Sequence, residues 1–310
     1  EECTNKGVIS VLSHIDSLSA YKPTDHTLTL FNTLPYAREE VIELVVDTPK
    51  GASAAADIGV GGAPTMGDFY DIIDSEGSKV EYVELSQEDI SIGVERQMDT
   101  KAIKFKANRK HILVKAKLPQ NGYVTYAMRM RAPELACHPE IMENRPLIAR
   151  DCGVLENKYL KVTLRPNGTF DMLDKQTGRL MEGLHYFTDT GEVGSAHISN
   201  VPKRNTVYTS LGANANITML ESNTLRGKFR IELSMMLPAA ATIDGNDRTR
   251  EMKELSISYI LTLEKDSRYL KVHTKLHNEH RDHKLTVNFP TGVANAEFAA
   301  CESAWDVANR

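Results

Sequence analysis

The sequence predicts a mostly β protein, in which a short N-terminal helix precedes a small antiparallel β-sandwich and a larger antiparallel β super-sandwich. From His26 onward, apolar and polar residues alternate with a period of two, the period of a half-buried strand. Predicted strands in the first half begin about every ten residues, a spacing typical of antiparallel sandwiches. The two longest predicted strands, residues 224–237 and 251–264, have no helix between them and favour a large sheet.

The first element is a predicted helix over residues 5–20. Thr4 or Asn5 can cap its start. Lys22-Pro23 ends it, since proline disfavours helix at the residue before it. Its apolar residues recur every three or four positions and form one stripe: Val8, Val11, Leu12, Ile15 and Leu18. We expect this stripe to pack on sequence outside the chain and residues 1–22 to be the remnant of a helical bundle.

A small β-sandwich is predicted over residues 23–132. Residues 32–36 form a turn between its first two strands and contain a proline. Residues 133–152 hold Pro133, Pro139 and Pro146 with little periodicity and are predicted to be a linker. The strands expected in the sandwich cover residues 26–32, 40–46, 69–73, 79–85, 90–95, 112–118 and 123–129.

The super-sandwich is predicted over residues 153–310, truncated at its C-terminal side. It opens with a strand over 153–164, and Asn167-Gly168 then provides a strong hairpin signal before a second strand over 170–174. Residues 174–178 form another turn. The strands over 224–237, 251–264 and 269–278 follow.

Composition excludes several classes of protein. The chain has 310 residues, 41% of them hydrophobic, and a net charge of −5, which fits a folded protein of about two domains. The acidic balance predicts no nucleic-acid partner, and no apolar run approaches the roughly 20 residues that span a bilayer. No signal peptide is visible at the N-terminus. The four cysteines show no metal-site spacing, which favours free thiols in a reducing cytoplasm over a Cys137–Cys152 bridge: Cys3, Cys137, Cys152 and Cys301.

No free-standing catalytic or metal motif is evident. The glycine-rich stretch at residues 59–62 lacks the lysine and helix of a phosphate-binding loop and is interpreted as a flexible loop. Four histidines cluster near residue 280, and a helix would bring three of them to one face. Residues 269–278 instead alternate like a strand, which puts His273 and His277 on its polar face. We therefore expect solvated histidines on that strand rather than a metal site built from the cluster: His273, His277, His280 and His283.

Several segments, in order, resemble family 38 α-mannosidases. Residues 30–41, LFNTLPYAREEV, look like the segment that opens the β region of that family. Residues 155–162 with the two turns that follow look like the opening of its C-terminal domain, and 278–290 look like a later strand pair. The likeness extends over roughly residues 26–310. Since the chain opens inside a predicted helix and stops at Arg310, we expect a piece of a longer protein.

The resemblance implies that this chain lacks the catalytic centre. In the family, an N-terminal catalytic domain and a helical bundle carry a divalent metal, usually zinc, and an aspartate nucleophile. The parent enzyme would hydrolyse α-mannosides with retention, using two carboxylates. No carboxylate pair here is assigned to those roles, and neither a catalytic residue nor a cofactor is expected in this chain. The implied partners are an α-mannoside or related glycan and the N-terminal catalytic domain of the same enzyme, in an oligomeric parent in the bacterial cytoplasm.

The resemblance also implies two places where the chain touches sugar. Residues 194–202 resemble a loop where relatives place an aromatic residue, and here the position holds His197. Residues 303–310 resemble a stretch where a basic residue reaches the substrate, which suggests Arg310 with Asp306 beside it. The ordinary alternatives are a surface histidine and a solvated arginine. Trp305, the only tryptophan, is predicted to lie in the core rather than to stack on a sugar.

A third candidate contact is the segment 281–283, from which Arg281 and His283 are the proposed ligands. The alternative is a charged hairpin tip with a local ion pair, which is common and weak.

Three functions therefore compete. The first is the non-catalytic β portion of an α-mannosidase. The second is an autonomous carbohydrate-binding module, which would bind glycans through exposed aromatic residues. The third is a mutarotase-like epimerase, which would use a histidine acid and a carboxylate base in a cleft.

Overall fold

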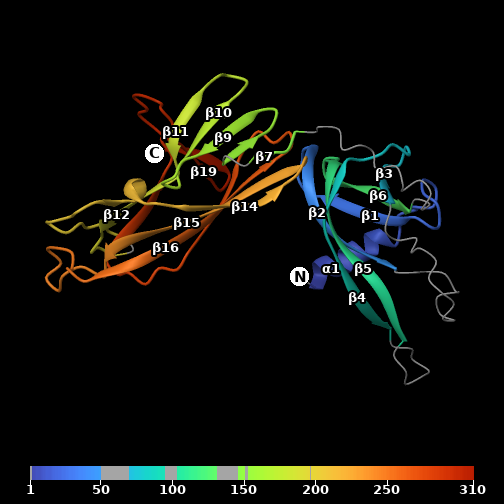
Figure 1. The fold of residues 1–310 in the computed structure, drawn as a ribbon, viewed down its shortest axis with the longest axis horizontal. Helices are drawn as coiled ribbons and strands as arrows, with labels where there is room; N and C mark the ends of the chain where they lie inside the picture. Colours follow the sequence, from blue (N-terminus) through green and yellow to red (C-terminus); the bar gives the residue numbers. More distant parts are fainter. Residues whose placement is uncertain (1, 50–69, 95–102, 131–145, 151–152, 196) are drawn as a thin grey trace. The chain divides into compact units, whose positions relative to one another are not determined.

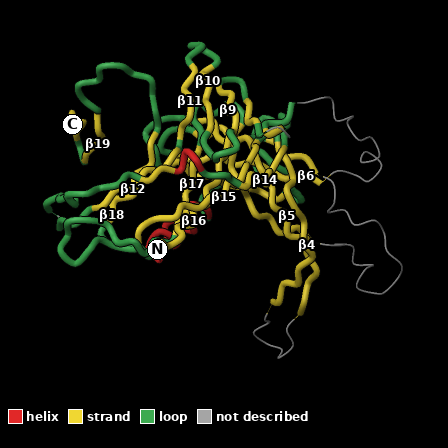
Figure 2. The backbone as a smooth tube through the Cα atoms, turned by 60° about the vertical axis from the view of Figure 1, so that its left-hand side comes forward, coloured by secondary structure: helices red, strands yellow, loops and turns green. Residues whose placement is uncertain are grey.

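Antiparallel strands make up most of the fold (Figures 1 and 2). The computed structural model describes residues 2–49, 70–94, 103–130, 146–150, 153–195 and 197–310. These contain twenty strands and one α-helix, α1 (Glu2–Leu12). The predicted mostly β class, with a short N-terminal helix, is thereby confirmed. None of the helical structure in these residues is long and apolar enough to cross a membrane.

Helix α1 ends at Leu12, earlier than predicted. The hydroxyl of Ser13 and the imidazole Nδ1 of His14 both bind the carbonyl oxygen of Ser10, at 2.8 and 2.7 Å. Such local side-chain bonds compete with the helical ladder and favour its termination. The described residues leave most of the apolar stripe exposed: Val8, Val11, Leu12 and Leu18.

The described chain divides into two units: Glu1–Pro146 with Asn223–Leu225 (unit 1), and Leu147–Ser222 with Arg226–Arg310 (unit 2). Most of the predicted linker, residues 133–152, lies outside the described residues, as do Cys137, Cys152 and the glycine-rich stretch at 59–62. The side chain of Cys3 is not described either, whereas Cys301 is a free thiol.

Unit 1 consists of two three-stranded sheets. One is ordered β1 (His26–Asn32), β6 (Gly122–Met130), β3 (Tyr70–Ile73); the other is ordered β2 (Arg38–Pro49), β5 (Ile103–Leu118), β4 (Tyr82–Val94).

The core of unit 1 lies between these sheets. Ile72 on β3 and Met128 on β6 are both fully buried, and they pack in one cluster with Ile112 and Val114 of β5. Burying a side chain of this size stabilises the fold by about 1.5–3 kcal/mol.

Strand β4 is longer than predicted. Residues 79–85 and 90–95 were expected to be separate strands, but β4 runs continuously over Tyr82–Val94 opposite β5. A register shift between Glu84 and Ser86 explains the difference, because a bulge breaks the two-residue alternation without ending the strand.

Unit 2 contains a five-stranded, a four-stranded, a three-stranded and a two-stranded sheet. The five-stranded sheet is ordered β11 (Leu180–Leu184), β10 (Phe170–Asp174), β9 (Leu160–Leu164), β8 (Val154–Glu156), β7 (Ala149–Arg150). The four-stranded sheet is ordered β14 (Asn216–Ser222), β15 (Arg226–Pro238), β16 (Met252–Glu264), β17 (Lys271–Leu276). The three-stranded sheet is ordered β13 (Tyr208–Thr209), β12 (Tyr186–Gly191), β18 (His283–Asn288), and the two-stranded sheet pairs β19 (Ala300–Ser303) with β20 (Asp306–Asn309).

The core of unit 2 lies between its five-stranded and four-stranded sheets. Every second side chain of β15 and β16 is buried, as the period-two pattern requires: Phe229, Ile231, Leu233, Met235, Leu237, Leu255, Ile257, Tyr259, Leu261 and Leu263. The opposite face of these strands is mainly polar and also carries Met236 and Ile260. Unit 2 therefore presents one face of its longest strands to solvent.

One predicted strand of unit 2 is divided. Residues 153–164 form β8 and β9, separated at Asn157. Its buried side chain accepts hydrogen bonds from the backbone NH groups of Tyr159 and Leu160 and donates to the carbonyls of Glu264 and Ser267. An asparagine that bonds its own following backbone makes a turn, which period counting does not detect.

Candidate functional site

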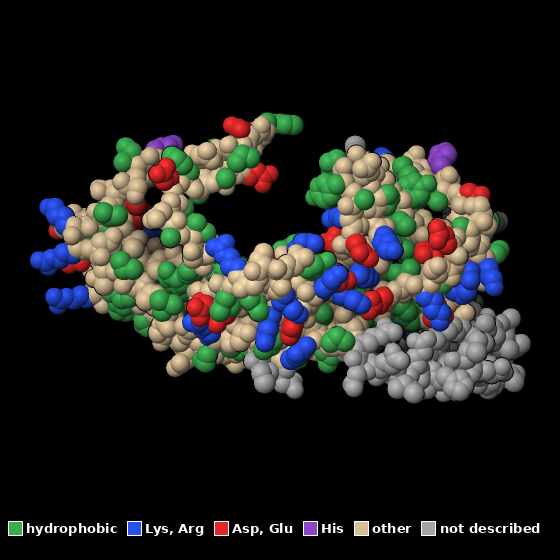
Figure 3. Space-filling view, turned by 90° about the horizontal axis from the view of Figure 1, so that it is seen from above, with side chains coloured by type: hydrophobic (Ala, Val, Ile, Leu, Met, Phe, Trp, Pro, Cys, Tyr) green, Lys and Arg blue, Asp and Glu red, His purple; other side chains and the backbone are tan. Residues whose placement is uncertain are grey.

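Three loops meet at one end of unit 2, here called the loop end, on the left-hand side of Figure 1. The backbone NH of Glu192 donates to the carbonyl of Asp282 at 2.9 Å, and that of Arg281 donates to Ala239 at 3.0 Å. Lys and Arg side chains gather at the left-hand edge of Figure 3, on the same side. The loops of the loop end comprise residues 192–207, 239–251 and 277–282.

A buried polar network supports the loop end. Asp189 on β12 is 0% exposed, and one of its carboxylate oxygens contacts Nδ1 of His283 on β18. Its other oxygen lies 2.5 Å from Nη2 of Arg248, an ion pair whose atoms are not aligned as a hydrogen bond. The guanidinium of Arg248 also lies over the Tyr208 ring, 5.3 Å from its centroid. The network thus joins two strands to the loop over 239–251.

Both ring nitrogens of His283 face oxygen acceptors. Nδ1 faces Asp189, and Nε2 lies 3.0 Å from Oδ1 of Asn278. That amide oxygen also accepts the backbone NH of His280 at 3.0 Å, which fixes its orientation. Both contacts are hydrogen bonds only when both nitrogens carry hydrogen. The His283 ring is therefore held between the Asp189 carboxylate and the Asn278 amide oxygen.

This arrangement differs from the charged hairpin tip considered for residues 281–283. The His283 side chain is only 4% exposed and pairs with Asp189 rather than locally. Asp282 adopts the left-handed conformation, φ 50°, and accepts the backbone NH of Ala241 at 3.2 Å. Arg281 is exposed.

Sequence reasoning missed Asp189 and Arg248. A signal existed for Asp189, because it shares the inward-facing period of β12 with the buried Phe187. An aspartate on the core side of a strand requires a partner. No local pattern marks Arg248, which lies in a polar loop.

His197 lies exposed in the first of these loops, residues 192–207. The Glu192 carboxylate holds the loop, since it accepts hydrogen bonds from the Ser199 hydroxyl at 2.6 Å and from the backbone NH groups of Asn200 and Gly194 at 2.7 and 3.0 Å. These hydrogen bonds lower the pKa of Glu192, and the bond from Ser199 has the largest effect. A Cβ at Gly194 would overlap the carbonyl oxygen of Ile198, so the turn requires glycine.

Asp306 and Arg310 lie elsewhere in unit 2, on and beside the β19–β20 hairpin. The backbone of Arg310 exchanges two hydrogen bonds with Ala299, at 2.9 and 2.7 Å, and Asp306 accepts the NH of Val307 at 2.7 Å. Both side chains are exposed. The structure therefore brings His197, Arg281 and His283 to one end and leaves these two candidates apart.

The prediction that Trp305 lies in the core is wrong for the described residues. It occupies the tip of the β19–β20 hairpin with a φ of 70° and is 104% exposed. Ser303 pairs with Asp306, so the turn leaves two residues at the tip, where neither side chain can reach the core.

The histidines near residue 280 are not arranged as a metal site in the described part of the chain. His273 and His277 are exposed, and His277 pairs with Glu279 at 3.1 Å. The ring of His280 is buried, with Nε2 lying 3.4 Å from the carbonyl oxygen of Lys253, while His283 is engaged as above. Within the ranges that the structure describes, no group of three or more His, Cys, Asp or Glu residues is placed to hold a metal ion.

Comparison with known families gives one match. The sequence pattern described as "Glycosyl hydrolases family 38 C-terminal domain" matches residues 155–310. These residues include the whole loop end and the β19–β20 hairpin.

One curated relative and two solved structures are also similar to this chain. A protein of Halalkalibacterium halodurans named "Putative mannosylglycerate hydrolase" is 27% identical over 172 residues, which cover 51% of this chain and 19% of that protein. An alpha-mannosidase of Enterococcus faecalis V583 shares the fold with a TM-score of 0.76 at 22% identity, over 99% of this chain and 36% of its own. A glycosyl hydrolase family 38 protein of Enterococcus faecalis gives a TM-score of 0.77 at 22% identity, with 99% and 37% covered. The chain thus spans about a fifth of the curated relative and little more than a third of each solved chain.

Proposed function

The chain belongs to glycoside hydrolase family 38, and we propose that it is the sugar-contacting, non-catalytic β portion of an enzyme that hydrolyses α-mannosides or related glycans. Of the proteins named above, one is named a putative mannosylglycerate hydrolase and another an alpha-mannosidase. In this proposal the groups that break the bond lie on polypeptide outside this chain.

One observation carries the sugar-contacting role: three interlocked loops present exposed hydrogen-bond donors above a buried charged network. Arg281 offers a fork of NH donors, and His197 can donate or accept. The Asp189 network and the Glu192 turn fix the backbone beneath both side chains. Rigid support of this kind reduces the entropy cost of binding a sugar.

The same network supports the non-catalytic role. Retaining hydrolysis requires one carboxylate as nucleophile and a second as acid and base, roughly 5–5.5 Å apart. Asp189, the fully buried carboxylate beneath the loop end, pairs with Arg248 and His283 instead. We propose that the nucleophile, and the zinc or other divalent ion expected to hold sugar hydroxyls beside it, belong to an N-terminal catalytic part of the same enzyme.

The setting of the parent enzyme follows as part of this proposal. The N-terminal catalytic domain is its first partner, and a bacterial cytoplasm is its compartment, in keeping with the free thiol of Cys301. The parent is proposed to be a homo-oligomer.

The sugar-contacting role is tested by titrating the 310-residue chain with methyl α-mannoside and following backbone amide signals by NMR. We expect saturable shifts at residues of the loop end. Arg281→Ala should weaken binding about tenfold, because a hydrogen bond to a charged group contributes about 1.5–3 kcal/mol.

Arg204→Ala is the matched control, because Arg204 lies in the same loop end but its guanidinium faces Asp247 at 3.8 Å. We expect the affinity of this variant for methyl α-mannoside to stay within about twofold of that of the unsubstituted chain. Absence of saturable shifts at the loop end, or equal effects of the two substitutions, would contradict the role.

A further inference from the structure

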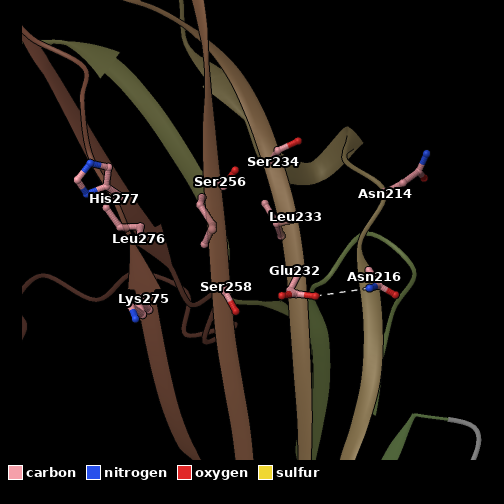
Figure 4. Close-up of a pocket in the computed structure, with 11 residues that line it drawn as sticks. Asn214, Asn216, Glu232, Leu233, Ser234, Ser256, Ser258, Lys275, Leu276 and His277 are labelled. Atoms are coloured by element: carbon pink, nitrogen blue, oxygen red, sulfur yellow. Dashed lines mark hydrogen bonds between the residues drawn. The ribbon is translucent and has the colours of Figure 1, made fainter.

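A groove crosses the outer face of the four-stranded sheet of unit 2, and it reaches the loop end only at His277. Its volume is about 540 Å³, within the range of ligand pockets. The groove is lined by Asn214, Asn216, Glu232, Leu233, Ser234, Ser256, Ile257, Ser258, Lys275, Leu276 and His277 (Figure 4).

Strand register places the polar lining in two parallel rows. In the first row, Asn216 pairs with Glu232, Glu232 with Ser258, and Ser258 with Lys275, so that one polar side chain comes from each of β14, β15, β16 and β17. In the second row, Ser234 pairs with Ser256, beside His277 just past the end of β17. The rows are roughly 7 Å apart along the strands, and the strands are spaced about 4.8 Å.

Side-chain length explains why a groove forms here. The central strands β15 and β16 carry the short side chains Ser234, Ser256 and Ser258, which form a low floor. Longer side chains rise on both sides: Glu232 with Asn216 on one, Lys275 with His277 on the other (Figure 4). A sheet face with no ligand to accommodate gains more from β-branched residues than from three adjacent serines.

The hydrogen-bonding capacity of the lining is largely open toward the groove. Among the side chains drawn in Figure 4, the one hydrogen bond joins Nδ2 of Asn216 to Oε2 of Glu232, at 3.5 Å. Each serine hydroxyl both donates and accepts, Lys275 donates, and Glu232 accepts. This mixture matches a ligand whose own hydroxyls both donate and accept.

Charge narrows the class of ligand. The walls carry opposite formal charges at Glu232 and Lys275, which are two strands, or roughly 10 Å, apart and do not pair directly. An anion would face repulsion from Glu232, and a cation from Lys275. The lining contains no Phe, Tyr or Trp ring on which an apolar ligand could stack.

The distance between the acidic and basic side chains of the groove disfavours the mutarotase-like epimerase as the function of this groove. A mutarotase-like reaction needs an acid and a base on one sugar ring. Glu232 on β15 and His277 beyond β17 are separated by the whole of β16 and are offset by one row. The two groups therefore reach different parts of the groove.

We propose that this groove is a second, non-catalytic subsite for one neutral sugar residue of a glycan, with the serine floor and the two charged walls binding its hydroxyls. The inference rests on the groove itself and does not depend on sugar binding at the loop end.

The test follows backbone amide signals of the 310-residue chain during titration with methyl α-mannoside, and in parallel with inorganic phosphate. We expect saturable shifts around Ser256, Ser258 and Lys275, with a Kd in the millimolar range, about 1–50 mM, because the lining offers no Phe, Tyr or Trp ring to stack on the sugar. Phosphate should give no saturable shift at these residues.

Ser256→Val with Ser258→Val should raise the Kd at the groove about tenfold or more, since valine suits a strand but offers no hydrogen bond. Thr262→Val is the matched control: Thr262 lies on β16 outside the groove lining, and its loss of a hydroxyl should change the Kd less than twofold. An unaltered Kd in the double variant, saturation by phosphate, or shifts at the loop end without shifts at the groove would each overturn the second subsite. In that last outcome the proposed function would stand.

Discussion

Asp189→Asn is expected to lower the free energy of unfolding of unit 2 by about 3–5 kcal/mol, because it leaves a buried guanidinium without its counter-charge. The side chains of Arg248 and His283 are each 4% exposed, so water cannot replace the lost carboxylate. The amide of asparagine keeps the shape but not the charge. Urea unfolding followed by circular dichroism and calorimetry, with the two units treated as separate transitions, measures the loss.

Glu182→Gln is the control for Asp189→Asn, because it removes a surface partner of Arg165 in the same unit, with Glu182 65% exposed. A change below about 1 kcal/mol is expected there. If an unpaired charge causes the loss, adding Arg248→Met to Asp189→Asn should restore at least about 1 kcal/mol. If the free energy of unfolding of Asp189→Asn lay within about 1 kcal/mol of that of the unsubstituted chain, the network would not hold the loop end together.

The second large effect is on the pH dependence of stability and involves His185, which is 2% exposed among aromatic rings. Burial lowers its pKa from 6.5 to about 4. Between these values the unfolded chain binds a proton that the folded chain does not, so stability decreases as the pH falls from about 6.5 to about 4. At about 1.4 kcal/mol per pH unit, this difference in pKa corresponds to about 3.5 kcal/mol in full, of which about 3 kcal/mol is lost by pH 4.

His185→Phe should remove this contribution. We expect the difference in free energy of unfolding between the unsubstituted chain and this variant to change by about 3 kcal/mol between pH 7.5 and pH 4. The constant cost of placing phenylalanine at the left-handed φ of 66° cancels in that comparison. His273→Gln, at an exposed position, should show no such change. If the free energies of unfolding of the unsubstituted chain and of His185→Phe changed in parallel with pH, the buried neutral histidine would be refuted.

Local patterns predicted the strands well where alternation was uninterrupted. Residues 26–32 and 170–174 were predicted as strands and are β1 and β10 with the same bounds. The alternation of 224–237 and 251–264 correctly marked the two long strands whose inner faces form the core of unit 2. Errors arose where a single residue altered the backbone, as at the bulge in β4 and the asparagine turn at Asn157.

The candidate site could be predicted only in part, because its key contacts join residues far apart in sequence. Motif likeness identified His197, Arg281 and His283, and the structure places them at one end of unit 2. Motif likeness gave no indication that Asp189 and Arg248 lie beneath them. Asp189 meets His283 only because β12 pairs with β18, and Arg248 reaches Asp189 from the loop over 239–251. The groove was likewise invisible, because its rows appear only when four strands are aligned.

The two alternatives make different predictions for the isolated chain. An autonomous carbohydrate-binding module would depend on aromatic platforms, of which the exposed Trp305 is a candidate. A mutarotase-like epimerase would accelerate the mutarotation of free sugars and lose that activity with one histidine. Neither alternative requires a further catalytic domain.

Hydrolysis of nitrophenyl α-mannoside by the purified 310-residue chain tests the central claim most directly. No release of nitrophenol above the uncatalysed background is expected, with or without added zinc, while methyl α-mannoside still shifts the amide signals of the loop end. Turnover that disappears when one carboxylate of this chain, such as Asp189 or Glu232, is replaced by its amide would show that the bond-breaking groups lie here after all.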